Sequence, residues 1–275
     1  MTTYAISPAL WQGEAGSNGA ERSPAGAYEL KCPVGLEVAE ALLDAAQLAL
    51  TWDPHCGADS SCNSQGGGYG ISSLYLDTAD LSVFCRQPGY ARKKFRIRRY
   101  GDAGEVFLEK KVKRRGVVRK QRTVVPLAEL GRLDSRSDGG DGPATWFRER
   151  LIRRQLCPTV QIRYQRHALI GESSGGPIRL TVDRSLHWRI ASDYLSWVGM
   201  GSWDGGNPSA ASGELFEGMA IVEFKFCNEL PPVFRQLMEQ FRLTPQACSK
   251  YRRAVESSCL PTARKVGQGL LVFEE

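Results

Sequence analysis

Cations placed two residues apart are the feature that most constrains how this chain folds. From Arg92 to Arg122 the 275-residue sequence holds fourteen Lys and Arg residues against three acids. At the start of this stretch, positions 92, 94, 96 and 98 are all cationic, whereas Phe95 and Ile97 between them are apolar. Because successive side chains of a strand point to opposite faces, this spacing predicts a strand with one cationic and one apolar face.

The two segments that follow repeat this alternation, with a predicted turn at 114–116 between them. The charged residues that share a face are Glu109, Lys111 and Lys113 in the first segment, and Lys120 and Arg122 in the second. Three strands joined by short turns are typical of an antiparallel meander. We therefore expect their cationic faces to line one concave surface.

The charge of this stretch indicates its partner. It carries a net charge of +11, although the whole chain carries only +6. Each strand taken alone could simply present its polar face to water, but a solvated face normally mixes its signs. We therefore expect an anionic ligand, and phosphate suits both the planar fork of Arg and the point charge of Lys.

The composition is that of an ordinary globular protein, with 42% apolar and 24% charged residues. No stretch approaches the roughly 20 apolar residues of a membrane span, and the first residues lack the pattern of a signal peptide. We therefore expect a cytoplasmic protein. The eight cysteines are scattered without a C-x-x-C pair, which indicates neither a zinc cage nor a disulfide framework.

The chain divides into a flexible N-terminal tail at 1–26, one domain at 27–257 and a C-terminal tail at 258–275. Within the domain, residues 55–68, 131–144 and 198–214 are predicted to be mobile loops, because Gly, Ser, Asn and Asp are frequent there. Further strands are predicted at 28–34, 70–77, 159–170, 178–186 and 219–226. Helical segments are predicted at 36–50, 80–87, 145–155, 231–241 and 249–256.

Three acid and base pairs with E-x-K spacing lie on predicted strands, at Glu29–Lys31, Glu109–Lys111 and Glu223–Lys225. One such pair has little meaning, since acids and bases often pair across sheets. Three such pairs, each on a strand flanked by apolar residues, favour a functional role. Carboxylates that project into a cationic, phosphate-filled space are what Mg²⁺ or Mn²⁺ requires, because these ions take oxygen ligands from carboxylates and substrate phosphates.

Eight segments occur in an order that matches a known family: YELKCPV, SLYLDTADL, KFRIRRYG, VFLEKKVKRRGVVRKQR, YQRHA, IRLTVDR, VEFKF and SKYRRAV. From Tyr28 to about Val255 the chain resembles the VTC domain, the polyphosphate polymerase domain of the vacuolar transporter chaperone type, within the triphosphate tunnel metalloenzyme (CYTH-like) superfamily. The resemblance implies an α+β fold in which an eight-stranded antiparallel β-barrel forms a tunnel with flanking helices.

The resemblance also implies roles for single residues. The expected phosphate-binding catalytic residues are Lys31, Arg96, Arg98, Lys111, Lys120, Arg166, Arg179 and Lys250, joined by Ser249. Facing alone adds Lys113 and Arg122 as phosphate ligands. Glu223 is the expected principal ligand of Mn²⁺ or Mg²⁺, with Glu29 and Glu109 as helpers. Two positions depart from the family pattern, since Ala27 stands where the superfamily has a leading acid and Ala247 where eukaryotic polymerases have a further Lys.

The implied activity is transfer of the γ-phosphate of ATP, or of another nucleoside triphosphate, to a growing inorganic polyphosphate chain. No P-loop motif is present, and none of the three histidines is paired with an evident nucleophile. Two alternatives remain open: a hydrolase of the same architecture, and a non-catalytic module that binds polyphosphate or RNA. A nucleic acid partner is not expected, because few aromatic residues lie among the basic strands. A separate membrane partner would have to supply any channel.

Overall fold

A computed structural model describes residues 27–54, 68–114, 117–133, 142–194 and 211–258. The predicted N-terminal tail, the predicted C-terminal tail after Ser258 and most of the three predicted mobile loops lie outside these ranges. Within them, no helix is long and apolar enough to cross a membrane.

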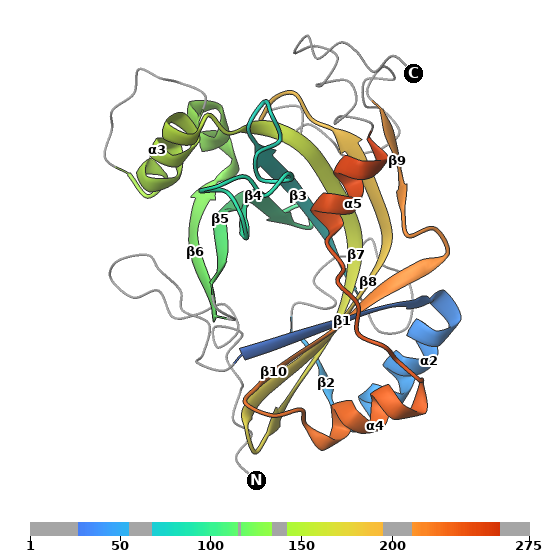
Figure 1. The fold of residues 1–275 in the computed structure, drawn as a ribbon. Helices are drawn as coiled ribbons and strands as arrows, with labels where there is room; N and C mark the ends of the chain where they lie inside the picture. Colours follow the sequence, from blue (N-terminus) through green and yellow to red (C-terminus); the bar gives the residue numbers. More distant parts are fainter. Residues whose placement is uncertain (1–26, 55–67, 115–116, 134–141, 195–210, 259–275) are drawn as a thin grey trace, which may run out of the picture.

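One antiparallel sheet dominates the described part of the chain (Figure 1). Its main path has eight strands, in the spatial order β1 (Ala27–Gly35), β10 (Met219–Cys227), β8 (Gly176–Ile190), β7 (Cys157–Ser173), β3 (Tyr69–Asp77), β4 (Lys93–Tyr100), β5 (Glu105–Arg114) and β6 (Val117–Pro126). Two short strands lie off this path: β2 (Thr51–Trp52) pairs with β7, and β9 (Ser212–Leu215) pairs with β8.

The sheet curves strongly but does not close into the predicted barrel. Among the described residues, β1 and β6 are both edge strands, and no backbone ladder joins them. A side-chain contact spans the opening instead, because Lys111 Nζ on β5 lies 3.1 Å from Glu29 Oε2 on β1. Two long side chains that meet end to end hold their backbones further apart than the roughly 4.8 Å of a strand ladder. The prediction of eight main strands is thus confirmed and that of closure is wrong.

Two apolar cores pack against the sheet, and helices cover much of its outer, convex side (Figure 1). Helices α2 (Leu36–Gln47) and α4 (Pro232–Gln240) cover one half, where Leu42 and Phe234 pack with Phe224 of β10. The 3-10 helix η1 (Leu127–Leu133) and helix α3 (Thr145–Arg154) cover the other half. The last helix, α5 (Lys250–Ser257), packs against β7 and β9.

The alternation in β4 explains how the sheet acquires two different faces. Phe95 and Ile97 are fully buried in the core beneath α3, together with Phe147 and Leu151. Residues of the opposite parity point to the inside of the curve, which we call the concave face, and on β4 these are Lys94, Arg96 and Arg98. The predicted cationic meander is therefore confirmed, except that Arg92 precedes β4 and has a left-handed φ of 60°.

The segment predicted as a helical turn at 80–87 is instead a series of tight turns. Both oxygens of the buried Asp77 carboxylate accept backbone N–H bonds: Oδ1 from Thr78 and Val83, at 2.7 Å each, and Oδ2 from Phe84 at 2.9 Å. These side-chain bonds satisfy backbone N–H donors that a helix would otherwise satisfy. The backbone therefore turns around the carboxylate instead of forming a helix. The two short strands β2 and β9 were not predicted, and β9 begins within the predicted loop at 198–214.

Candidate functional site

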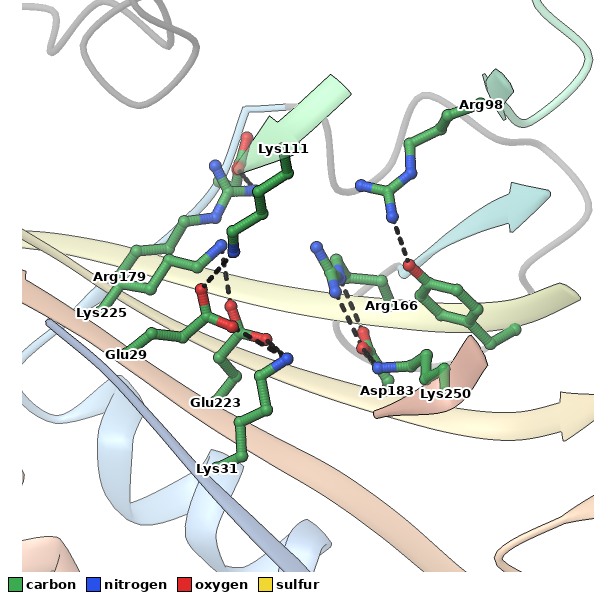
Figure 2. Close-up of polar contacts among 12 residues, drawn as sticks. Glu29, Lys31, Arg98, Lys111, Arg166, Arg179, Asp183, Glu223, Lys225 and Lys250 are labelled. Carbon is green, nitrogen blue, oxygen red and sulfur yellow. Dashed lines mark hydrogen bonds and ion pairs between the residues drawn. The ribbon is translucent and has the colours of Figure 1, made fainter. Parts of the chain in front are cut away.

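The E-x-K pairs of β1 and β10 meet on the concave face. Antiparallel pairing sets Glu29 opposite Lys225 and Lys31 opposite Glu223. Lys31 Nζ lies 2.8 Å from Glu29 Oε1 and 3.1 Å from Glu223 Oε2, and Lys225 Nζ lies 2.8 Å from Glu223 Oε1 (Figure 2). With Lys111 these residues form what we call the carboxylate network, in which two acids converge on a single ammonium group.

Both acids of the carboxylate network are held ionised. Burial and the nearby Glu223 would raise the pKa of Glu29, but Lys31, Lys111 and Lys225 outweigh them and lower it to about 2. Burial likewise opposes ionisation of Glu223, which is only 4% exposed, yet Lys225 and Lys31 hold its pKa well below the usual range. At neutral pH the network therefore presents two carboxylates to any cation that enters.

A second cluster surrounds Asp183 of β8, which is fully buried. Arg166 of β7 donates two hydrogen bonds to its carboxylate, from Nε to Oδ1 at 2.6 Å and from Nη2 to Oδ2 at 2.8 Å. Lys250, the first residue of α5, donates from Nζ to Oδ2 at 2.6 Å. Asp183 was not among the predicted site residues, although it shares the parity of Arg179 on the same strand, and that signal could have found it.

A third cluster forms around Glu109 of β5, which is 2% exposed. Its carboxylate contacts Arg96 Nε, and its Oε1 atom lies 3.2 Å from Lys120 Nζ and 3.3 Å from Arg122 Nε. Burial would raise the pKa of Glu109, but Arg96, Arg98, Lys120 and Arg122 hold it well below the usual range. Glu109 thus lies among guanidinium and ammonium groups and holds three predicted phosphate ligands together.

Arg98 of β4 is a buried cation of the concave face. It is 7% exposed, and its hydrogen-bond partners are neutral: Ser73 Oγ at 3.2 Å and Tyr164 Oη at 3.1 Å. No ion pair of Arg98 occurs among the described residues. A buried guanidinium without a carboxylate is costly unless an anion joins it. Arg179 differs, because Asp53 Oδ2 lies 2.5 Å from its Nη2 atom and Tyr69 Oη 3.0 Å.

The start of α5 brings two more predicted residues to the concave face. Ser249 caps this helix, since its Oγ accepts from Arg252 N at 3.3 Å, and it also accepts from Lys94 Nζ at 3.1 Å. Burial, together with the nearby Lys31 and other cations, lowers the pKa of Lys94 to about 8. Lys94 was placed on the cationic face by its spacing but was not named as a ligand. The side chain of Lys113 lies outside the described residues.

Comparison with protein families identifies the family of the chain. The family model described as the VTC domain matches residues 31–259. The chain belongs to the VTC domain family. The resemblance inferred from the eight sequence segments is thereby confirmed, and the match covers every strand of the curved sheet except the first residues of β1.

Solved structures also resemble this VTC domain, at low identity. An adenylate cyclase candidate from Bacillus halodurans shares 13% identity with a TM-score of 0.45, over 82% of this chain and 95% of its own. A Pyrococcus horikoshii OT3 protein shares 12% identity at 0.41, over 83% and 99%. An adenylyl cyclase candidate from Hippeastrum, described as having a dominant triphosphatase activity, shares 13% identity at 0.41, over 82% and 93%. No curated protein matches the chain.

The carboxylate network of this VTC domain fits a hard divalent ion. The described residues contain no group of three or more His, Cys, Asp or Glu side chains that would cage a metal alone. Glu29 and Glu223 nevertheless both reach Lys31 Nζ, so their oxygens converge on one small region. Mg²⁺ and Mn²⁺ are commonly held by one or two carboxylates together with substrate phosphates. Glu109 fits this role less directly, because its oxygens contact three cations.

Proposed function

We propose that this VTC domain is an enzyme that transfers the γ-phosphate of a nucleoside triphosphate, such as ATP, to the end of an inorganic polyphosphate chain. Mn²⁺ or Mg²⁺ would assist, held by Glu223 with help from Glu29 and Glu109. The predicted phosphate ligands keep the roles that the family resemblance implies for them. We expect the reaction to take place in the cytoplasm, and a separate membrane protein to move the product if it crosses a bilayer.

The excess of cations on the concave face is the observation that carries this proposal. Among the described residues, the carboxylates that form ion pairs on this face are Glu29, Asp53, Glu109, Asp183 and Glu223, whereas the cations that line it are Lys31, Lys94, Arg96, Arg98, Lys111, Lys120, Arg122, Arg166, Arg179, Lys225 and Lys250. Several of these cations are less than a tenth exposed. Buried like charges repel one another strongly, so the face is suited to a ligand that brings many negative charges in a narrow chain.

The chemistry that suits such a face is phosphoryl transfer. A terminal oxygen of the polyphosphate chain attacks the γ-phosphorus, a new P–O–P bond forms, and the bond to the β-phosphate oxygen breaks as the nucleoside diphosphate leaves. Arg98, Arg166 and Lys250 would neutralise charge that spreads over the transferred group and the leaving phosphate, and they are already fixed in position. The divalent ion would supply further charge neutralisation when bound.

Two alternatives differ in the nucleophile or in the absence of reaction. A hydrolase of the same fold would use water, which must lose a proton, whereas a phosphate chain end is already anionic. Of the two histidines in the described residues, His167 packs against Trp52, and His187 stands opposite Arg163 in the strand register. Positions 163 and 167 of β7 have the parity opposite to Arg166, so both histidines lie on the convex side of the sheet. A passive receptor would gain nothing from Glu29 and Glu223, because carboxylates weaken anion binding unless a metal bridges them.

The test is to incubate the purified protein with ATP and Mn²⁺, with and without a short polyphosphate primer, and to resolve the products by gel and by free-phosphate assay. Long chains together with ADP would support the polymerase. Free phosphate without chains would replace the proposal by a tunnel-type hydrolase. Tight binding of polyphosphate without turnover would replace it by a receptor.

A further inference from the structure

A second group of cations lies on the opposite, convex side of the sheet, beside α3. Lys93 of β4 has the parity of the buried Phe95, and Lys110 of β5 stands opposite Phe95 in the strand register. Both therefore lie on the side of the sheet that α3 covers, outside the curve (Figure 1). With three arginines of this helix they make up what we call the outer cluster: Lys93, Lys110, Arg150, Arg153 and Arg154.

Within the described residues, the cations of the outer cluster have few hydrogen-bonding partners. In the described chain, none of its five members forms an ion pair. Lys93 Nζ and Arg154 Nη1 both donate to one backbone carbonyl, that of Gly89, at 3.1 Å in the case of Arg154. Arg154 Nε is buried without a hydrogen-bond partner. A single neutral carbonyl thus serves two cations, and one buried donor remains unused.

The positive charges of the outer cluster lower the pKa values of its two lysines. Burial, followed by the positive charges of Arg150, Lys93, Arg154 and Arg153, lowers the pKa of Lys110 to about 8. Burial, Arg154 and Arg150 likewise lower the pKa of Lys93. Arginines in the last turn of a helix are favoured by the helix dipole, and this accounts for Arg153 and Arg154. It does not account for two lysines brought to the same place by β4 and β5.

Neighbouring residues put cations on both sides of the same two strands. Lys93 and Lys110 belong to the outer cluster, whereas Lys94 and Lys111, which follow them directly in the sequence, point to the concave face. We propose that the outer cluster is a second binding site for inorganic polyphosphate, which holds the part of a long chain that extends beyond the concave face. This inference rests on the proposed function, since it takes the ligand of the concave face to be polyphosphate.

Two observations favour a bare phosphate chain over other polyanions. Arg154 of the cluster lies over the ring of Tyr90, 5.2 Å from its centroid, so this ring is not free for stacking of nucleic acid bases. The two lysines are partly buried between the strands and α3, a position that a narrow chain reaches more easily than the flat surface of an anionic bilayer.

The test compares two double variants, both made in the Glu223→Gln protein. This background is expected to prevent turnover, so that binding is measured alone, whether the unmodified protein is a polymerase or a hydrolase. Lys110→Gln with Arg153→Gln removes two charges from the outer cluster. Arg235→Gln with Arg242→Gln, two exposed arginines in and just after α4, removes the same charge elsewhere. Affinity is measured for labelled long-chain polyphosphate and for tripolyphosphate, which is too short to occupy both sites.

A long chain that occupies both sites gains affinity from their linkage, so loss of the outer cluster should weaken its binding by about tenfold or more. Tripolyphosphate should bind all variants alike, and the control pair should retain affinity for the long chain. Equal loss in both double variants, or unchanged long-chain affinity in the outer-cluster variant, would overturn the inference. So would displacement of the long chain by RNA or by anionic phospholipid vesicles at equal phosphate concentration.

Discussion

Lys31 of β1 and Glu223 of β10 stand opposite each other in the strand register, with Nζ and Oε2 3.1 Å apart. Lys31 also binds Glu29, at 2.8 Å. The ammonium group therefore occupies the oxygens that a divalent ion would use, and a metal must share or replace this contact. Metal binding at this site would therefore be linked to the release of a cation that could then bind phosphate.

Replacing Glu223 with Gln should abolish metal-dependent turnover, with a loss of at least about hundredfold. The change keeps the shape of the side chain but removes the charge that the metal needs. Affinity for tripolyphosphate should stay the same or increase, because a negative charge is lost from a cationic face. Turnover and equilibrium binding are measured in parallel, with the exposed Glu239→Gln of α4 as the control. Normal turnover by the Glu223 variant would refute the metal assignment.

Replacing Arg96 with Ala should weaken binding itself. The loss of one charged hydrogen-bond donor to phosphate corresponds to a rise of about tenfold or more in the Kd of tripolyphosphate. Glu109 should remain ionised, because Lys120 and Arg122 still contact it. Titration calorimetry checks this prediction, and Arg235→Ala on α4 serves as the control. Equal Kd values for the wild type and the Arg96 variant would remove Arg96 from the binding site.

Replacing Asp183 with Asn should destabilise the protein by about 3 kcal/mol, because Arg166 and Lys250 would be left without their buried counter-ion. Tripolyphosphate should restore more stability to this variant than to the wild type, since phosphate can take the place of the lost carboxylate. Urea denaturation with and without tripolyphosphate measures both effects. The exposed Asp44→Asn of α2 is the control, and an Asp183 variant as stable as this control would contradict the role given to Asp183.

Asp183 also sets a dependence on pH. Burial would raise its pKa, but Arg166 and Lys250 hold it well below the usual value. A group whose pKa is lower in the folded state contributes stability that is complete above its unfolded pKa of about 4 and is lost as the pH falls further. The wild type should therefore lose stability steeply below about pH 4, and the Asp183→Asn variant less steeply. Parallel slopes would contradict this expectation.

Tyr100 should report whether the concave face is occupied. Burial would raise its pKa, but Arg98, Arg122 and Lys120 outweigh burial and Glu109, and lower it to about 7. Tyrosinate absorbance should therefore show a phenol that titrates near neutrality, and this titration should be absent in Tyr100→Phe, where Tyr75 with a pKa of about 8 remains.

Tripolyphosphate should move the Tyr100 titration to higher pH, because its negative charge opposes formation of the phenolate. The exposed Tyr28→Phe is the control and should retain the titration. The lowered pKa also contributes stability that is complete above the unfolded value of about 10 and is lost as the pH falls toward 7. A titration that tripolyphosphate does not shift would mean that phosphate binds elsewhere.

Much of the concave face could be predicted from the alternation within single strands. Phe95 and Ile97 on one side and Arg96 and Arg98 on the other follow directly from the two-residue period of a strand. The E-x-K spacing likewise indicated that Glu29 and Glu223 project to the same side as their lysines. These are local properties, which depend only on which residue follows which.

Properties that depend on distant strands could not be predicted in this way. The pairing of Asp183 with Arg166 requires the register of β7 and β8, which shifts between Arg163 and Gln165. Whether β1 and β6 pair, or leave an opening that Glu29 and Lys111 span with a side-chain contact, depends on the curvature of the whole sheet. The turns after β3 depend on the Asp77 carboxylate, whose competition with a helix cannot be read from the apolar spacing of 80–87.

The most direct test of the account is a crystal structure of the protein with Mn²⁺ and a triphosphate analogue that resists cleavage. The anomalous signal of the metal locates it independently of the phosphates. We expect the metal at Glu223 and Glu29, and phosphate oxygens against Arg98, Arg166 and Lys250. A triphosphate bound away from the concave face, or a metal without contact to Glu223, would contradict the proposed phosphoryl-transfer site.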